Sequence, residues 1–406
     1  MHILMLTGQL PYPPYAGGAL RTFGLLSGLH EAGHNVDLLT FTEPSQPDPL
    51  TPLSGLCERI VTVSLPTRRA TDRLRDLVLK RRPDLVGRYS SPEFERRLME
   101  LLAQGDYDLA QIESLEMACY LPLIRQIRPA LRTIYDSFNA EFDLQHRIFE
   151  IDRGVPARFV GAVYSLIQWR RLTRFERQVC ESVDRVIAVS EADAVAFARL
   201  VPGLRAAIVP NGITVTDYLN PPTQILDLGQ AALLFTGTMN YRPNVDAVIW
   251  FADNVLSRVR ETVPDARLFI VGNRPHSRLD NLRARSEIEV TGYVQDMLPF
   301  LSAATVYVAP LRMGSGTRLK LLQAMAAGNA IVSTSLGAQG LNVSSGREMI
   351  LADDAESFAH AVVGLLQNPS RRASIGQAAR KLVCEQYDWS VIVPRLLKVY
   401  GEMGLK

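Results

Sequence analysis

Short apolar runs alternate with amphipathic, helix-like stretches along the whole chain. The first half contains strand candidates at Ile3–Thr7, Val36–Phe41, Ile60–Val63, Leu109–Ile112, Thr133–Tyr135 and Val186–Val189. A second series follows at Ala232–Thr236, Arg267–Val271, Glu287–Thr291, Thr305–Ala309, Ala330–Thr334 and Met349–Leu351. Because strands separated by helices form βαβ units, the pattern predicts an α/β protein with parallel sheets covered by helices on both faces.

Turn-forming residues separate the two series, at Val209–Gly212 and Asn220–Pro222. The pattern therefore predicts two doubly wound domains in tandem, at residues 1–210 and 222–387. In such sheets ligands bind outside the carboxyl ends of the strands. We expect the two domains to face a central cleft.

A glycine-broken loop, Met313–Gly316, leads from the Thr305–Ala309 strand into a predicted helix at Thr317–Ala327. A helix N-terminus offers free backbone N–H groups and a positive dipole end to an anion. Gly17 and Gly18 stand between the first strand and the next predicted helix in the same way. Both loops are therefore candidates for phosphate binding.

The predicted helix after Gly316 has one polar face. At about 100° per residue, Lys320 and Gln323 share this face with Thr317, which suits a phosphate followed by a sugar hydroxyl. Arg318 lies about 100° off that line and ranks below Lys320 as a ligand. An ordinary amphipathic helix with solvated Lys320 and Gln323, closed by Gly328, fits the same pattern, so both interpretations stay open.

Composition narrows the classes of function. The chain has 406 residues, enough for two or three domains, and its net charge of +2 gives no global case for nucleic-acid binding. Four widely spaced cysteines form no CxxC or Cys/His pattern, which argues against a disulfide framework or a structural zinc site. The chain start lacks a signal-peptide pattern, and no apolar run reaches the length of a bilayer span. We therefore expect a soluble cytoplasmic protein.

Two stretches, Arg68–Arg97 and Arg158–Arg171, combine basic residues with apolar ones. Basic amphipathic segments can lie on an anionic membrane surface, which would make the protein peripheral at the inner membrane face. A solvated helical face whose apolar side lies in the core is the alternative.

Several short motifs occur along the chain in a characteristic order. They are Pro11–Arg21, Val186–Glu191, Val209–Ile213, Phe235–Asp246, Val290–Val294, Pro310–Gly328 and Val332–Leu341. In this order and spacing they resemble glycosyltransferase family 4, the retaining nucleotide-sugar transferases of the GT-B fold. The resemblance covers nearly the full length of the chain.

The resemblance implies two Rossmann-like domains, with the acceptor bound by residues 1–210 and the nucleotide sugar by residues 222–387. Residues 388–406 would pack back on the first domain. The family needs no metal and no further cofactor, so its partners are a nucleotide sugar and a glycan, glycolipid, other lipid-linked or small-molecule acceptor. In a retaining transfer the acceptor hydroxyl attacks the face from which the diphosphate leaves, with a departing phosphate oxygen as the base.

Residue roles follow by carry-over from the family motifs. Lys320 and Arg318 are expected to contact the diphosphate together with the backbone N–H groups of Gly316 and Thr317. The Gly17–Gly18 pair would approach the same phosphate from the other domain, because only a backbone without Cβ allows close contact. A simple helix-entry turn is the alternative for these two glycines.

The resemblance also implies contacts to the base and the acceptor. Tyr293 and Val294 would meet the base through backbone groups and stacking, although a core tyrosine is the alternative. Arg21 and Asn139 are candidates for acceptor binding; Arg21 would reach the phosphate or the acceptor, or form a surface salt bridge instead.

The chain departs from the family pattern at both phosphate and sugar positions. Thr238 and Pro243 stand where an Arg and a Lys often bind phosphate, which leaves Lys320 with Arg318 as substitutes. Ser315 and Gln323 replace the two glutamates of the E-x7-E motif. Gln offers one acceptor oxygen and a donor, so we expect ribose binding that survives but is weaker. Ser315 takes the place of the glutamate that contacts the transferring sugar.

Two further departures concern histidines. Glu113 and Phe138 stand where many members carry a histidine near the reacting centre. Glu113, at a strand end, would act as the catalytic base or orient the sugar, or else cap the following helix.

Three other functions fit parts of the pattern. A non-catalytic GT-B partner or binding subunit would explain the missing glutamates and histidines. A sugar-nucleotide 2-epimerase shares the fold but would place carboxylates and histidines in the cleft. A nicotinamide enzyme is disfavoured because no GxGxxG follows the first strand.

Overall fold

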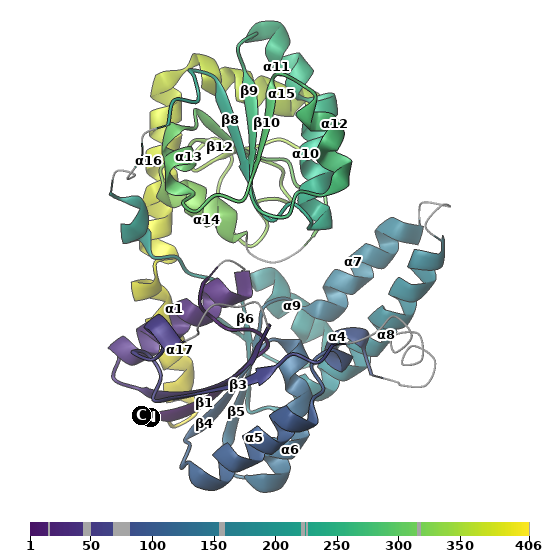
Figure 1. Cartoon of the computed structure of the whole chain (residues 1–406), viewed down its shortest axis with the longest axis vertical. Helices are drawn as coiled ribbons and strands as arrows, with labels where there is room; N and C mark the ends of the chain where they lie inside the picture. Colours follow the sequence, from purple (N-terminus) through teal and green to yellow (C-terminus); the bar gives the residue numbers. More distant parts are fainter. Residues whose placement is uncertain are drawn as a thin grey trace. The chain divides into compact units, whose positions relative to one another are not determined.

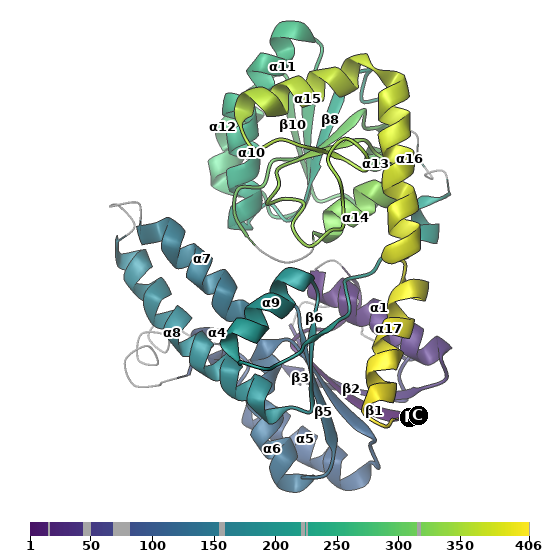
Figure 2. The same ribbon diagram turned by 180° about the vertical axis from the view of Figure 1, so that it is seen from behind.

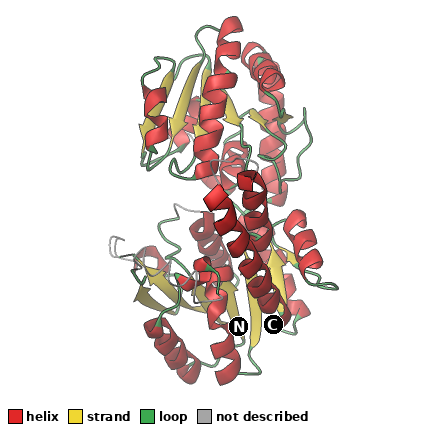
Figure 3. Ribbon diagram, turned by 90° about the vertical axis from the view of Figure 1, so that its right-hand side faces the viewer, coloured by secondary structure: helices red, strands yellow, loops and turns green. Residues whose placement is uncertain are grey.

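The computed structural model describes residues 1–14, 17–43, 50–67, 82–153, 159–220, 224, 226–314 and 318–405. Its contacts divide the chain into two compact units. Unit 1 comprises Met1–Asn211 and Ile392–Lys406, and unit 2 comprises Gly212–Val391. In each unit helices cover both faces of a parallel sheet (Figure 3), so the predicted fold class is confirmed.

The sheet of unit 1 has seven parallel strands in the order β3-β2-β1-β4-β5-β6-β7 (Figure 1). They are β1 (His2–Thr7), β2 (Asn35–Thr42), β3 (Arg59–Ser64), β4 (Leu109–Glu113), β5 (Arg132–Ser137), β6 (Arg185–Ala188) and β7 (Ala207–Ile208). The first six match the predicted runs to within two residues, because fully buried parallel strands are continuous apolar runs. The two-residue edge strand β7 was not predicted, since it is too short to show a pattern.

Helices surround this sheet on both faces. They are α1 (Gly17–Glu31), α2 (Leu50–Leu53), α4 (Asp84–Gly87), α5 (Pro92–Gln104), η1 (Leu115–Tyr120), α6 (Leu121–Ile127), α7 (Glu141–Arg153), α8 (Phe159–Ser182), α9 (Glu191–Leu200) and most of α17 (Trp389–Glu402). The terminal helix α17 lies along α1 (Figure 2). A Cβ added to Gly28 of α1 would lie 2.1 Å from Cγ2 of Val393, and the Tyr400 hydroxyl donates to Gln111 of β4. The end of the chain is therefore part of the core of unit 1.

The sheet of unit 2 has six parallel strands in the order β10-β9-β8-β11-β12-β13. They are β8 (Ala232–Thr236), β9 (Arg267–Val271), β10 (Ile288–Gly292), β11 (Val306–Ala309), β12 (Ile331–Ser333) and β13 (Ile350–Leu351). Its helices are η3 (Val215–Tyr218), α10 (Arg242–Asn254), α11 (Leu256–Thr262), η4 (Ser277–Leu279), α12 (Asp280–Arg283), α13 (Leu298–Ala303), α14 (Leu319–Ala326), α15 (Ala355–Gln367) and α16 (Pro369–Gln386).

Both sheets reverse their strand order at one point, between β1 and β4 in unit 1 and between β8 and β11 in unit 2. Connections leave in opposite directions at such a switch point, so a crevice opens at the carboxyl ends of the strands and ligands bind there. These two points are where a site is expected.

Helix α14 differs in part from the prediction. It begins at Leu319, because Arg318 is its N-cap residue with extended backbone angles (φ −85°, ψ 91°). It ends as predicted, with Gly328 in the left-handed region at φ +78°. Because Arg318 precedes the helix, its angle on the helix cannot be used to rank it below Lys320 as a ligand. Ser315, Gly316 and Thr317 lie outside the described residues.

The basic stretches fall partly within the described chain. Residues 68–81 and Arg158 lie outside it, while α8 carries the rest of the second stretch. No helix of the described residues is long and apolar enough to cross a membrane.

Candidate active site

The carboxyl edge of the unit 2 sheet is built on closely packed glycines. Gly237 follows β8 and Gly272 follows β9, with φ of +150° and +155°. A Cβ added to Gly272 would lie only 1.7 Å from the carbonyl oxygen of Gly237. The Gly272 N–H in turn donates to the carbonyl of Gly292 at 3.1 Å, at the end of β10. Only glycine allows three strand ends to meet this closely, which leaves a bare backbone edge beside the switch point.

Lys320 reaches this edge from the first turn of α14. Its Nζ donates to Oδ1 of Asn244 at 2.8 Å and lies 4.0 Å from the centroid of the Phe235 ring. Asn244 itself donates to the carbonyl oxygen of Thr238 at 2.9 Å. The ammonium group is thus held between the end of β8 and the start of α14, on the two sides of the switch point.

A second cation stands beside Lys320. Burial and the nearby Arg318 guanidinium lower the pKa of Lys320 well below its ordinary value. The Arg318 side chain lies over Gly314: a Cβ added there would be 2.8 Å from Arg318 Nη2. Two mutually repelling cations that share one partly buried edge are stabilised by an anion between them. A diphosphate supplies that charge and accepts hydrogen bonds from both.

Three further predicted donor residues belong to unit 2. Tyr293, directly after β10, is 59% exposed. Val294 is half-buried and packs against the core. Burial raises the pKa of Tyr218 to about 12, partly offset by a hydrogen bond with Gln323. The Gln323 amide can form more than one hydrogen bond, so this contact leaves capacity for a ligand hydroxyl.

In unit 1 the predicted glycines open α1. Gly17 is exposed at the helix N-terminus, as phosphate binding would require. A Cβ added to Gly18 would lie 2.7 Å from Cε2 of Phe138, the residue at an expected histidine position. Packing against Phe138 is therefore enough to explain glycine at position 18.

Arg21 has a structural role instead of the predicted one at the acceptor. It is 1% exposed and forms a bidentate ion pair with Asp136, with Nη2–Oδ1 at 2.7 Å and Nε–Oδ2 at 3.0 Å. Its remaining guanidinium nitrogen, Nη1, donates to the carbonyl of Pro210 and to Asn211. The prediction missed this because the partner, Asp136, is distant in sequence.

Glu113 is also buried rather than displayed to a substrate. It is 1% exposed, accepts from Gln111 Nε2 at 2.6 Å and contacts the Thr22 hydroxyl at 3.4 Å. Burial and the negative charge of Asp136 raise the pKa of Glu113 to about 8. Its placement argues against the predicted contact with the reacting sugar and favours a protonated carboxyl within the core.

Polar groups that sequence reasoning overlooked stand near the predicted Asn139. The Asn139 amide donates to Oε1 of Glu141 at 3.3 Å, directly after β5. Burial and the charge of Glu116 raise the pKa of Glu141 to about 7. Glu116 follows β4 and lies against Gly8, at the switch point of unit 1. These half-buried acids are candidates to bind hydroxyl groups.

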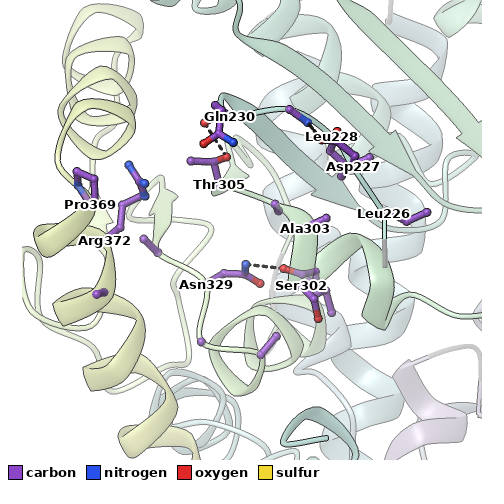
Figure 4. Close-up of a pocket in the computed structure, with 17 residues that line it drawn as sticks. Leu226, Asp227, Leu228, Gln230, Ser302, Ala303, Thr305, Asn329, Pro369 and Arg372 are labelled. Atoms are coloured by element: carbon purple, nitrogen blue, oxygen red, sulfur yellow. Dashed lines mark hydrogen bonds between the residues drawn. The ribbon is translucent and has the colours of Figure 1, made fainter. Parts of the chain in front are cut away.

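One hollow of unit 2 lies away from this edge. A pocket of about 510 Å³ opens at the amino ends of β8, β11 and β12, where Gln230, Thr305 and Asn329 line it (Figure 4). None of the predicted site residues lines this pocket. Since α/β sheets bind ligands at the carboxyl ends of their strands, the glycine edge remains the candidate site.

Asn244 is a candidate site residue of unit 2 that sequence reasoning missed. It lies within the Phe235–Asp246 motif, one residue after Pro243, which replaces the usual lysine. An amide at this place indicates a partner for a cation from another element, and that cation is Lys320.

Comparison with known proteins identifies the family. Residues 15–217 match Glycosyltransferase Family 4, and residues 230–368 match Glycosyl transferases group 1. The first match covers half of the chain. A phosphatidyl-myo-inositol mannosyltransferase of Mycolicibacterium smegmatis is 26% identical over 92% of this chain and 86% of its own. An uncharacterized 44.6 kDa protein in the cps region of Klebsiella pneumoniae is 22% identical over 98% of this chain and 99% of its own.

Solved structures agree on the fold. Sucrose-phosphate synthase from Thermosynechococcus elongatus matches 99% of both chains with a TM-score of 0.76 at 17% identity. Anabaena HepE in complex with UDP and glucose matches 99% of this chain and 100% of its own, with a TM-score of 0.68 at 13% identity. Together with the sequence matches, the GT-B architecture shows that the chain belongs to glycosyltransferase family 4 and is a glycosyltransferase that uses a nucleotide sugar.

Proposed function

We propose that the protein transfers a sugar from a nucleoside-diphosphate sugar to a glycan or lipid-linked acceptor, with retention at the anomeric carbon and without a metal at the reacting centre. The observation that carries this proposal is the paired cation edge of unit 2. Lys320 is held by Asn244, which lies against the backbone of Gly237, and Arg318 lies over Gly314.

The chemistry of departure explains why these cations matter. When the bond between the anomeric carbon and the phosphate oxygen breaks, negative charge develops on the diphosphate. Fixed cations aimed at that charge stabilise the transition state more than the ground state. We infer that Lys320 and Arg318 do this, that Tyr293 stacks on the base and that Gln323 contacts the ribose. The acceptor hydroxyl attacks the same face and passes its proton to the departing phosphate oxygen.

The acceptor belongs, in this proposal, to the carboxyl edge of unit 1. Burial and the charge of Glu116 raise the pKa of Glu141 there, and Asn139 contacts Glu141. Carboxylates and an amide accept and donate hydrogen bonds to sugar hydroxyls. The cps-region relative supports an acceptor in polysaccharide assembly, and the mannosyltransferase relative supports a lipid-linked one.

Helix α8 supports peripheral contact with a membrane that carries such an acceptor. Val163 and Tyr164 are 43% and 41% exposed near its start. Arg170 and Arg174 are exposed further along, and at about 100° per residue they lie on the same face as Val163. Exposed apolar and basic groups on one helix face suit an anionic lipid surface.

A vesicle assay tests this membrane contact. Wild type is expected to sediment with phosphatidylglycerol vesicles and not with phosphatidylcholine vesicles, and the double change of Val163→Ser and Tyr164→Ser should abolish this. Leu219→Ser removes a similarly exposed apolar side chain, 54% exposed in unit 2, and should leave sedimentation unchanged. Equal sedimentation of the double variant would remove α8 from the proposal.

Product analysis tests the transfer itself. Purified protein is incubated in EDTA with individual α-linked nucleotide sugars and a lipid or glycan fraction as acceptor, and the product is followed by proton NMR. Release of the nucleoside diphosphate with an α-linked product is the expected result. A β-linked product would contradict retention. If no donor gives either transfer or slow hydrolysis, the result would favour a non-catalytic binding subunit.

A further inference from the structure

A second cluster of polar side chains lies at the opposite, amino-terminal edge of the unit 1 sheet. It consists of His2 at the start of β1, Asp37 on β2 and Glu58 directly before β3. Asp37 pairs with Leu4 in the parallel register, so its side chain lies on the same face as those of Leu4 and His2. Three neighbouring strands therefore bring these groups together.

The ligand atoms of the cluster converge on one point. His2 Nε2 lies 3.5 Å from Asp37 Oδ1 and 3.8 Å from Glu58 Oε2. All three atoms lie within 4.8 Å of one another. Ligands of a tetrahedral ion with bonds of about 2.1 Å lie about 3.4 Å apart. The spacing therefore matches atoms that share one cation.

Asp37 is fixed in place and lacks a donor on one side. It is 2% exposed, and its Oδ2 accepts from the Tyr107 hydroxyl at 2.6 Å. The other oxygen, Oδ1, is buried with no hydrogen-bond partner in the described part of the chain, and the same holds for His2 Nε2. The guanidinium of Arg59 lies 3.9 Å from Oδ2, the oxygen that Tyr107 already holds. A buried carboxylate oxygen without a partner is costly and calls for a cation.

A simple ion pair between His2 and Asp37 does not satisfy this geometry. An imidazolium would donate to the carboxylate at about 2.7–2.9 Å. The two atoms instead stay 3.5 Å apart without a hydrogen bond, both aimed at the space that Glu58 borders. An ion between them would satisfy both.

We propose that His2 Nε2, Asp37 Oδ1 and Glu58 Oε2 form a binding site for a divalent transition-metal cation of the zinc type. One imidazole nitrogen with two carboxylate oxygens suits Zn²⁺, whereas Mg²⁺ and Ca²⁺ take oxygen ligands. A water completes four-coordination. Tyr107 acts on the metal through Asp37, because its hydroxyl fixes the orientation of that carboxylate.

The place of the site separates it from the transfer chemistry. Thr7, at the carboxyl end of β1, follows His2 by five residues, which is about 17 Å along the strand. The cation would thus tie together the beginnings of β1, β2 and β3 and stabilise unit 1. The neighbouring Cys57 is buried, but its thiol is not among the atoms that converge at this point.

Metal titration of tag-free, chelator-treated protein tests the site. Zn²⁺ is followed by calorimetry and Co²⁺ by its d–d absorption, with the melting temperature recorded in parallel. We expect one equivalent to bind and to raise the melting temperature. His2→Ala and Glu58→Gln should each weaken binding by more than the roughly 10–100-fold that loss of an outer-shell partner costs. The Glu58 side chain is 58% exposed, so its variant removes a ligand without disturbing the core.

Matched changes elsewhere supply the control. His30→Ala and Glu31→Gln alter an exposed histidine and an exposed acid at the end of α1, outside the cluster, and should bind the metal as wild type does. The proposal is overturned if wild type shows no saturable binding of Zn²⁺ or Co²⁺. It is equally overturned if either ligand variant binds as tightly as wild type.

Discussion

Replacement of Lys320 by methionine tests the donor site in detail. The change keeps an unbranched chain of similar length but removes the ammonium that Asn244 holds at 2.8 Å. A hydrogen bond to a charged group contributes about 1.5–3 kcal/mol, so the Kd for the nucleoside diphosphate should rise roughly 10- to 150-fold. Loss of a preorganised donor to developing charge should lower kcat by roughly 100- to 1,000-fold.

The lowered pKa of Lys320 adds a second signature. A bound diphosphate favours the ammonium form and draws a proton onto Lys320, so wild-type affinity should fall as pH rises through the lowered pKa. Between that pKa and the ordinary value, the unfolded chain binds the proton more tightly than the folded one. As pH rises through this range, the free energy of unfolding of wild type should therefore increase relative to that of Lys320→Met.

Calorimetry with the diphosphate at several pH values, and urea unfolding at the same values, measure both effects. Lys381→Met, which removes a 74% exposed lysine on α16, is the matched control and should bind like wild type. Diphosphate binding by Lys320→Met with wild-type affinity and wild-type pH dependence would refute the assignment of Lys320 to the phosphate.

Three further changes and one control variant test other features of the chain. Glu113→Gln should keep most transferase activity. Because the pKa of Glu113 in the folded protein is raised to about 8, the variant should be thermally more stable than wild type above pH 8 and equally stable near pH 4. A loss of activity of 100-fold or more would restore Glu113 as a catalytic group. Gly272→Ala should lower the free energy of unfolding by roughly 3 kcal/mol or more, because its Cβ would meet the Gly237 carbonyl. Gly229→Ala, which shares a positive φ but has open space, should cost only about 1 kcal/mol in the same denaturant titration. Gln323→Glu should bind the donor at least as tightly as wild type in calorimetry, since a carboxylate accepts from both ribose hydroxyls, and a clear loss of affinity would remove Gln323 from the ribose.

The fold was predictable because its signal is local. Buried parallel strands such as Ala232–Thr236 are continuous apolar runs, and Gly328 marks a helix end wherever it lies in space. The family motifs then indicated which strand ends are candidates for the site. They singled out Lys320 as a candidate, since its loop and helix are adjacent in sequence.

Side-chain partners were not predictable, because they come from distant parts of the chain. The sequence left Arg21 available for a ligand, but Asp136 occupies it in the core. Glu113 follows a strand as a catalytic acid would, yet its carboxyl lies within the sheet's buried network with Gln111. No motif connects His2 with Asp37 and Glu58, since each stands on or beside a different strand, and the sequence accordingly predicted no metal.

Binding of nucleoside diphosphates is the direct test of a donor site at Lys320 and Arg318. UDP, GDP, TDP and ADP are titrated by calorimetry into wild type and into Lys320→Met. Both proteins are first treated with EDTA, so that any effect of bound metal on stability is the same in both. We expect one diphosphate to bind wild type one-to-one in EDTA, and to bind the variant at least tenfold more weakly. Absence of binding by all four, or equal binding by both proteins, would contradict a donor site at the paired cations of unit 2.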